Sequence, residues 1–331
     1  MPILYTEPHA PTGPPVSAER EVATVTWTSR SGVETILSNW RSGFLLTAGS
    51  KGLGMPQYQL YLRESGALDG DVVTGVRAKP REIFLPIAIY GNDRADALAK
   101  RAMLASVFDP LAVNGGGEGV LTVAEPGAEP RSIRAYYTEG MEGAEGKEEA
   151  GLNWAKFGIT LHASEPYWQG VETSRLWSIG QTTETFLPIG PPKYLKVRTA
   201  QVIGTAVPVD CPGDTRSYPR WTIHGPVAAG ASFVNRTLGL TWKLNRALSA
   251  TDVVVVDTRP RRRTIVLNGT DNLWPSLEPA SDLWPLAPGA NVVDMNLGGA
   301  GDTTSVQLTF VPLYKTAYPT AAPQTLAART A

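Results

Sequence analysis

The residue types best suited to catalysis or metal binding are scattered along this chain and form no recognisable constellation. The three histidines are His9, His162 and His224, and the single cysteine is Cys211. No two of these four residues have the spacing of a helical or zinc-binding pair. His224 lies in the segment WTIHG on an expected strand, where a general base would need a nucleophile that the sequence does not supply. We therefore predict no metal ligand, no catalytic residue and a hydrogen-bonded place in a sheet for His224.

Two glycine clusters and one acidic motif also lack the pattern of a ligand site. Residues 49–54 read GSKGLG and residues 115–119 read GGGEG, and neither contains the Gly-Lys-Ser/Thr order of a phosphate-binding loop. Asp69-Gly-Asp71 opens like a calcium loop, but the later oxygen ligands are missing from the register. We interpret this motif as a turn and predict no bound cofactor.

One run of cationic side chains stands out, formed by Arg259 and Arg261 to Arg263. A solvated loop face is the preferred interpretation over an anion or nucleic-acid contact. As a hypothesis, the run contacts the Gly- and Glu-rich segment 140–151 of another subunit. That segment has no apolar face, so we expect a solvated loop there.

Two of the nine tryptophans, Trp274 and Trp284, each lie in a Leu-Trp-Pro sequence. Exposed tryptophans can stack on sugar rings in β-sandwich lectins. Packing in a core or an interface is the default interpretation, since a chain with this many tryptophans must bury several of them.

The composition is that of a globular protein without a field that would attract phosphate backbones or anionic lipid. Hydrophobic residues make up 42% of the chain, charged residues 18%, and the net charge is -1. The length of 331 residues favours two domains of roughly 150 residues each. A single cysteine excludes an internal disulfide. The start MPILYTEPHAPTGPP lacks a secretion signal, and no apolar stretch approaches the ~20 residues that span a bilayer, so we expect neither export by that route nor membrane insertion.

The elements that must position any site are mostly short strands. The 33 glycines and 27 prolines are scattered without a period, which favours many strands joined by turns. Residues 19–62 alternate in short runs typical of a meander. The clearest strand is Arg81 to Tyr90, where Ile83, Leu85, Ile87 and Ile89 share one face. Pro86 within it removes a ladder bond, which predicts an edge strand or an adjacent bulge.

One helix is predicted, over the segment ADALAKRAMLASVF at residues 95–108. Asn92 or Asp93 can cap its first turn, and Asp109-Pro110 ends it. Strands near Gly119 to Ala124 and Arg131 to Glu139 then predict a hairpin, and another strand includes Trp154 to Leu161.

The second half is almost free of helical periodicity, and its short strands favour a β-sandwich. Residues 320–331 are expected to fray. The strand candidates are Tyr194 to Arg198, Val202 to Pro208, Arg220 to Gly225, Leu238 to Leu244, Val253 to Asp257, Arg263 to Leu267, Ala290 to Met295 and Thr304 to Pro312.

The order of these elements and of several short motifs resembles the siphophage distal tail protein family over most of the chain. The segments from 140 and from 258 to 263 have no counterpart in the family pattern and leave accessory contacts open. The motifs are Gly70-Asp71, residues 81–91 (REIFLPIAIYG), Glu165-Pro166-Tyr167-Trp168, residues 219–226 (PRWTIHGP), Asp257-Thr258, residues 283–291 (LWPLAPGAN) and residues 306–314.

This resemblance implies a mainly β protein with an N-terminal β-rich belt domain containing one helix, residues 1–168. A galectin-like β-sandwich at 169–319 and a flexible tail at 320–331 would follow. It implies a structural virion protein, not an enzyme, that forms a homohexameric ring connecting the tail tube to the tail hub and receptor-binding or fibre proteins. The implied location is the tail tip of the virion, after assembly in the host bacterial cytoplasm.

Two alternatives remain open at this stage. The first is a carbohydrate-binding tail module that contacts host-surface glycans, because galectin-like sandwiches include lectins. The second is a cell-envelope hydrolase, which would need a carboxylate pair at a fixed separation, and no pair stands out among the 31 acidic residues.

Overall fold

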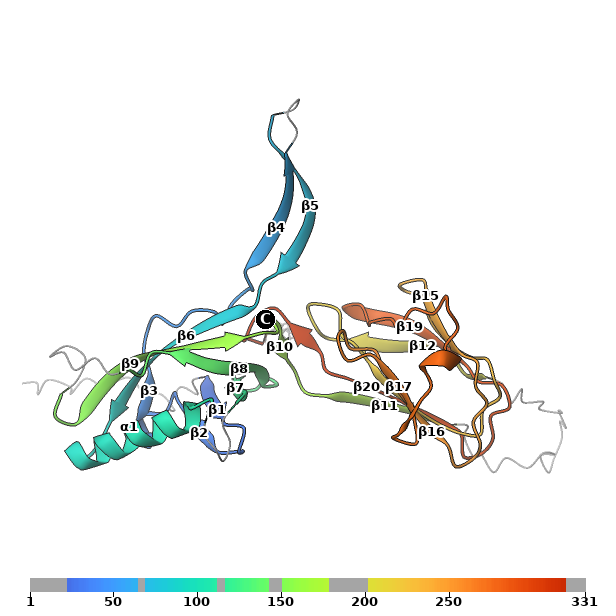
Figure 1. Ribbon diagram of the computed structural model, residues 1–331. Helices are drawn as coiled ribbons and strands as arrows, with labels where there is room; N and C mark the ends of the chain where they lie inside the picture. Colours follow the sequence, from blue (N-terminus) through green and yellow to red (C-terminus); the bar gives the residue numbers. More distant parts are fainter. Residues whose placement is uncertain (1–22, 65–68, 112–116, 143–150, 179–201, 320–331) are drawn as a thin grey trace, which may run out of the picture.

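The computed structural model describes residues 23–64, 69–111, 117–142, 151–178 and 202–319. Within these residues the chain is mostly β-strand and has one α-helix, which confirms the predicted fold class. Buried apolar side chains form two clusters. One lies between a nine-stranded sheet and the helix, and the other lies between a six-stranded and a four-stranded sheet. Figure 1 shows these two bodies side by side, with a hairpin rising from the first. No helix in the described residues has the length and apolar content needed to cross a membrane.

The first body is an antiparallel sheet with one helix against it. The helix α1 (Arg94–Phe108) buries Leu104 and Phe108. Each strand of the sheet alternates, so that one set of side chains enters the core beneath the helix. The strand order is β2 (Glu34–Ile36), β1 (Thr24–Thr28), β7 (Gly119–Ala124), β8 (Arg131–Glu139), β9 (Trp154–Ala163), β6 (Arg81–Tyr90) and β3 (Phe44–Leu46), with the 3-10 turn η1 (Trp40–Ser42) before β3.

The predicted helix and the β7–β8 hairpin are confirmed. Asp93 is the N-cap of α1, and its carboxylate accepts a hydrogen bond of 2.8 Å from the backbone N–H of Asp96. The helix ends at Phe108, directly before Asp109-Pro110.

Of the two positions predicted for β6, at a sheet edge or beside a bulge, the edge is wrong. The pairing next to Pro86 is irregular, since Leu46 pairs with Ile87 and Lys51 with Phe84. All ten residues of β6 pair with β9, and Ile87 to Ile89 also pair with β3, so β6 lies inside the sheet. Pro86 is tolerated because its ring nitrogen faces the side where β3 has already ended at Leu46. The Pro86 carbonyl still accepts a bond of 2.8 Å from Thr47 N–H, and only the reciprocal bond is lost.

The strands β4 (Tyr58–Glu64) and β5 (Asp71–Ala78) form a hairpin that pairs with no other strand. It lies between β3 and β6 in the sequence and projects away from both bodies in Figure 1. Sequence reasoning placed β4 at the end of a meander and did not predict β5.

The second body is a β-sandwich with an aromatic centre. Trp221, Phe233, Trp242 and Trp284 are all buried, and the Phe233 and Trp242 rings stack at 4.1 Å. One sheet has the order β11 (Thr173–Ser178), β20 (Ser305–Phe310), β13 (Arg220–His224), β16 (Val253–Asp257), β17 (Thr264–Leu267) and β18 (Asp271–Asn272). The other has the order β12 (Val202–Cys211), β19 (Gly289–Asn296), β14 (Ala231–Asn235) and β15 (Leu240–Leu244).

Seven of the eight predicted strands in this half are confirmed with small shifts at their ends. The eighth, Tyr194 to Arg198, lies outside the described residues, as does the segment 320–331. The strands β11 and β14 were not predicted.

The chain returns from the sandwich to the first body at its end. The strand β21 (Leu313–Tyr314) pairs with β10 (Trp168–Gln169), which also pairs with β8. Tyr314 and Ala317 are buried in the first core. The two bodies are therefore joined by two crossings of the chain, and the division at residue 168 stays a prediction.

Two buried arginines, which have no carboxylate partner among the described residues, hold this return segment. The Arg81 guanidinium donates to the carbonyls of Pro166 and Lys315 at 2.8 and 2.9 Å. The Arg131 guanidinium lies over the Tyr314 ring and donates to the carbonyls of Thr316 and Tyr318 at 2.9 and 2.8 Å. Burial lowers the pKa of both arginines, but their ordinary pKa is so high that both stay charged. Charge-assisted bonds to carbonyls replace the water that these groups lose.

We predict that Arg131→Met destabilises the junction, because two carbonyl acceptors lose a charged donor. The expected loss of unfolding free energy is about 2 kcal/mol or more, and trypsin should cleave faster after Lys315. The control is Arg134→Met on the same strand. The Arg134 side chain is 60% exposed, and its one ion pair in the described chain, to the Glu118 carboxylate, is long at 3.7 Å. That change should cost at most ~0.5 kcal/mol. Equal thermal stability of the two variants would contradict the proposal that Arg81 and Arg131 together hold the return segment, an arrangement we call the clasp.

Candidate assembly surfaces

The β4–β5 hairpin carries an apolar face that no other described part of the chain covers. Leu60 pairs with Val76 and Leu62 with Val73, so these four side chains share one face. They are 53, 60, 51 and 53% exposed in that order. Tyr58 continues the same face at 40% exposed. An isolated two-stranded hairpin is marginally stable in water, so this face needs a partner.

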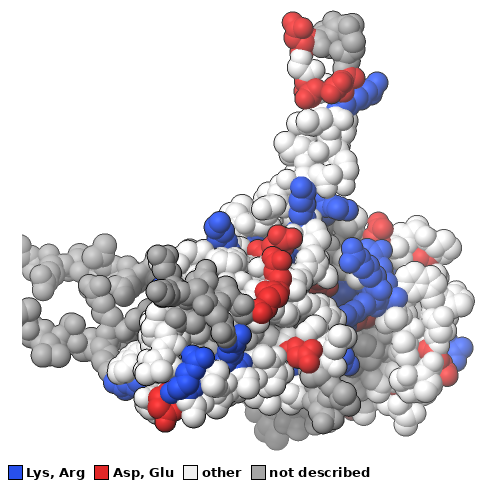
Figure 2. All heavy atoms as spheres, turned by 60° about the vertical axis from the view of Figure 1, so that its left-hand side comes forward, with Lys and Arg blue, Asp and Glu red and all other residues white. Residues whose placement is uncertain are grey.

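The opposite hairpin face is mixed, and the tip is acidic. Gln59 pairs with Arg77 on that face. The tip holds Glu64, Asp69 and Asp71 beside Arg63. Figure 2 shows charged side chains at the tip above a shaft that is almost free of them.

The motif Asp69-Gly-Asp71 lies at this tip, where Gly70 has a φ of 85°. That backbone conformation favours glycine and fits the predicted turn, although residues 65–68 lie outside the described chain. Within the described residues no group of His, Cys, Asp or Glu has the geometry of a metal site.

A second exposed surface lies where β6 ends and α1 begins, and we call it the corner. Its apolar members are Trp40, Tyr90 and Leu152, which are 68, 42 and 78% exposed, and the half-buried Trp154. Backbone pairing connects them, since Tyr90 pairs with Trp154 and donates its N–H to the Gly43 carbonyl at 2.8 Å.

Cations surround the aromatic side chains of the corner. The Arg41 guanidinium lies 6.0 Å from the Trp40 ring centroid, and the Lys156 ammonium lies 5.6 Å from that of Trp154. The Arg94 guanidinium donates to the Gly151 carbonyl at 3.0 Å.

An ion pair fixes the first turn of α1 at the corner. The Lys100 ammonium bonds both the Asp96 carboxylate and the Tyr90 carbonyl at 3.0 Å. A hydrogen bond from the Asn92 N–H, with Lys100, lowers the pKa of Asp96. This carboxylate is therefore ionised at neutral pH, and its charge is already matched by Lys100.

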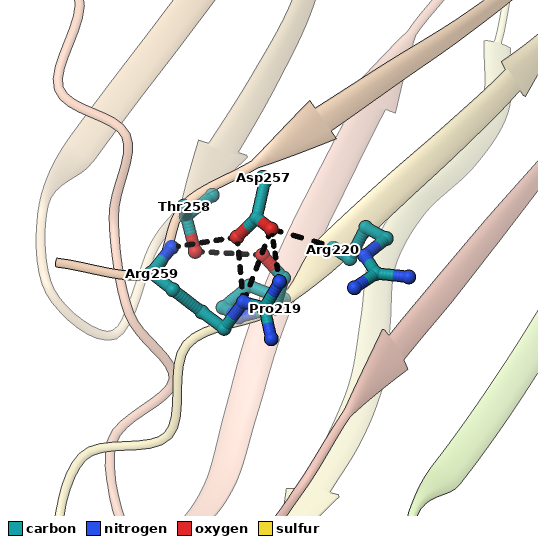
Figure 3. A network of polar contacts seen from close by, with 5 residues as sticks. All are labelled: Pro219, Arg220, Asp257, Thr258 and Arg259. Carbon is teal, nitrogen blue, oxygen red and sulfur yellow. Dashed lines mark hydrogen bonds and ion pairs between the residues drawn. The ribbon is translucent and has the colours of Figure 1, made fainter. Parts of the chain in front are cut away.

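Arg259 differs from the rest of the arginine run because it is paired with Asp257 (Figure 3). The buried Asp257 carboxylate accepts bonds from the Arg259 backbone and guanidinium, and Arg220 Nε lies 3.9 Å away. Burial acts to raise the pKa of Asp257, but the bonds from Arg259 outweigh it and lower that pKa. Thr258 completes the network by donating to the Pro219 carbonyl at 2.7 Å.

Arg261 to Arg263 are exposed and form no ion pair with the described part of the chain. Arg261 has a φ of 65°, so the backbone turns sharply there and presents the guanidinium groups to solvent. The solvated loop face predicted for this run fits these three residues but not Arg259.

The remaining candidate residues do not come together. His162 lies on β9 and His224 on β13, each half-buried in its sheet, and His9 lies outside the described residues. Cys211 is buried, with its Sγ 3.3 Å from Ser217 Oγ. In the glycine cluster at 49–54, the carbonyls of Gly52 and Gly54 accept bonds from Arg81, so this cluster serves the fold.

The two Leu-Trp-Pro sites differ in environment. Trp284 is 1% exposed in the sandwich core and donates its indole N–H to the Phe233 carbonyl at 3.1 Å. Trp274 is 44% exposed on the 3-10 turn η2 (Trp274–Ser276). Only Trp274 can therefore stack on an external ring.

The apolar hairpin face and the corner were both missed by sequence reasoning. The alternation of Tyr58, Leu60 and Leu62 was visible, but it predicts a strand with one buried face. Alternation does not reveal whether the same chain or another one covers that face.

Comparison with known proteins agrees with this architecture. Residues 212–314 match the family model of the siphovirus-type tail component, C-terminal domain. A search of curated protein sequences found no similar protein. The solved structure of the Dit protein of phage SPP1, described as a paradigm of the hub adsorption apparatus in phages that infect Gram-positive bacteria, is 15% identical. It matches with a TM-score of 0.59 and covers 88% of this chain and 99% of that one.

Two structures of the phage P2 baseplate in its activated conformation, with Ca and with Sr, are 10 and 11% identical. Their TM-scores are 0.46 and 0.45, and each covers 87% of this chain and 98% of its own. These lower scores add nothing to the fold assignment, which rests on the SPP1 protein. The chain therefore has the fold of the SPP1 Dit protein, and its residues 212–314 match the model of the siphovirus-type tail component, C-terminal domain.

Proposed function

We propose that this protein is a structural, non-catalytic component of the tail tip of a long-tailed phage. It forms a homohexameric ring through its first body, residues 1–168. The ring joins the tail tube to the tail hub and to receptor-binding or fibre proteins. Subunits assemble in the host cytoplasm before they become part of the virion. The family match and the distal tail fold support this role.

The observation that carries the ring is the apolar hairpin face. Five side chains on one face of β4 and β5 are at least 40% exposed, although Leu, Val and Tyr on a strand pair are ordinarily buried against a second layer. Full burial of each such side chain stabilises the assembled protein by ~1.5 kcal/mol or more relative to leaving that side chain exposed. A neighbouring copy supplies that layer without any further component.

A carbohydrate-binding tail module is the second candidate, and exposed Trp274 is the observation that favours it. Trp274 is 44% exposed, and the exposed Asn272 beside it, whose Oδ1 accepts the Trp274 backbone N–H at 2.9 Å, keeps its amide N–H groups for sugar hydroxyls. A lectin site needs several such groups in one cleft, so the assembly role is the better supported of the two.

The ring proposal predicts that the purified protein is a hexamer, or becomes one with its tail partners, by size-exclusion chromatography with light scattering. Leu60→Asp should raise the dissociation constant of the ring by about 100-fold, because it places a charge in a buried apolar contact. Gln59→Asp adds the same charge on the opposite hairpin face and is the matched control. If the wild-type protein stays monomeric at micromolar concentration, both alone and with its tail partners, the ring proposal is wrong.

The arginine run gives a test of accessory contacts between subunits. If Arg261 to Arg263 meet an acidic segment of a neighbour, such as 140–151, reversal of their charges to Glu should slow assembly several-fold at low salt. The difference from wild type should shrink at 1 M salt, where the screening length falls to ~3 Å. Light scattering of assembly at both salt concentrations measures it, and identical time courses would argue for a purely solvated run.

For the glycan candidate, binding on a glycan array should disappear in Trp274→Ala if that ring holds a sugar. Wild-type protein that binds no glycan on the array would remove this candidate and leave the ring proposal untouched.

A further inference from the structure

We infer that the β4–β5 hairpin of one copy docks onto the corner of the next copy, so that the ring closes through a head-to-tail contact between two different surfaces. This inference rests on the proposed function and specifies the surfaces that perform it. The corner comprises Trp40, Tyr90, Leu152 and Trp154 with the cations around them.

The two surfaces lie at opposite ends of one rigid strand. The strand β5 ends at Ala78 and leads through Lys79 and Pro80 into β6 at Arg81. The corner begins at Tyr90, where β6 ends. Ten residues of strand span about 30 Å at ~3.3 Å per residue, and β9 pairs with every one of them. The hairpin also points away from the sheet in Figure 1, so one copy cannot bring its own two surfaces together.

Placement at opposite ends of a rigid body favours a ring. A contact between unlike surfaces repeats from copy to copy and closes when the rotation divides a full turn. A symmetric contact between two hairpins would stop at a dimer. It would also leave Trp40 and Leu152 uncovered, which are two of the most exposed large apolar side chains in the described chain, at 68 and 78%.

The two surfaces match in chemistry. The hairpin face offers aliphatic side chains, namely Leu60, Leu62, Val73 and Val76. The corner offers aromatic rings and Leu152. Aliphatic and aromatic groups pack well across neighbouring strands and interfaces, and aromatic residues are enriched at interface centres.

Their charges are also complementary. At the hairpin tip the three carboxylates of Glu64, Asp69 and Asp71 against Arg63 leave a net charge of -2. At the corner, Arg94, Lys100 and Lys156 against Asp93 and Asp96 leave a net charge of +1. Opposite charges at the rim of an apolar contact guide association and fix its register.

Disulfide trapping with two single-cysteine proteins tests the contact. Leu62→Cys places a thiol on the hairpin face, Leu152→Cys places one at the corner, and native Cys211 is buried and stays unreactive. Mixed under mild oxidation, the two proteins should give a cross-linked heterodimer, whereas each protein alone should give none. Cross-linking of Leu62→Cys with itself would overturn the inference in favour of a symmetric hairpin contact.

The readouts separate this inference from the proposed function. If wild-type protein forms a ring by light scattering but the mixed cysteine proteins do not cross-link, the docking surfaces are wrong and the ring stands. If wild-type protein forms no ring even with tail partners, both fall.

Charge reversal with rescue provides a second, independent test. Asp71→Lys and Lys156→Glu should each raise the dissociation constant of the ring by about tenfold at low salt. The doubly substituted protein should recover most of that loss, because the pair is restored with its signs exchanged. Arg134→Glu, on the sheet away from the corner, is the control and should leave assembly unchanged. Additive losses in the double variant would overturn the pairing.

Discussion

The apolar face of the β4–β5 hairpin imposes the constraint on which the rest of the molecule depends. Two strands cannot bury a face against themselves, so five exposed apolar side chains require a layer that the described part of the chain does not supply. Most of the other features of the first body serve to present this hairpin at a fixed place. The sheet gives it a rigid base, and β6 separates it from the corner by a defined distance. The proposed ring of identical copies would need such fixed geometry, because small angular errors add up around a ring.

The clasp formed by Arg81 and Arg131 extends this rigidity to the sandwich. Neither guanidinium pairs with a carboxylate in the described part of the chain, and both instead bind carbonyls of segments that cross between the bodies. A buried ion pair would gain little stability over apolar packing, whereas an arginine that satisfies several carbonyls fixes the path of the chain. The chain passes from the first body to the sandwich near Trp168 and returns at Tyr314, and the clasp joins these two crossings. The sandwich therefore cannot swing on a single linker.

How far the sequence predicts this structure depends on whether the decisive contact lies within one chain. Helix α1 and strands such as β6, β9 and β16 follow from periodicity and caps, because their apolar faces are buried locally. The prediction of an edge position for β6 was wrong, because Pro86 removes a ladder bond only on the side where β3 has ended. The strand β14 was missed because its buried positions include Ala231 and Asn235, which give a weak apolar alternation. The corner was not predictable, since Trp40, Tyr90 and Leu152 are far apart in sequence and meet only through sheet register.

The same distinction explains which part of the chain the family model recognises. The matched residues, 212–314, contain most of the sandwich core, where Trp221, Phe233, Trp242 and Trp284 must fit one another. Close packing restricts such positions in both volume and shape, so their pattern persists as long as the fold does. The hairpin and the corner lie outside the matched segment. In the proposed contact between copies, both surfaces belong to the same chain, so a substitution on the hairpin can be matched by a second substitution on the corner. The contact residues are therefore constrained only to match each other, and a docking surface has to be found from geometry and charge within the individual protein.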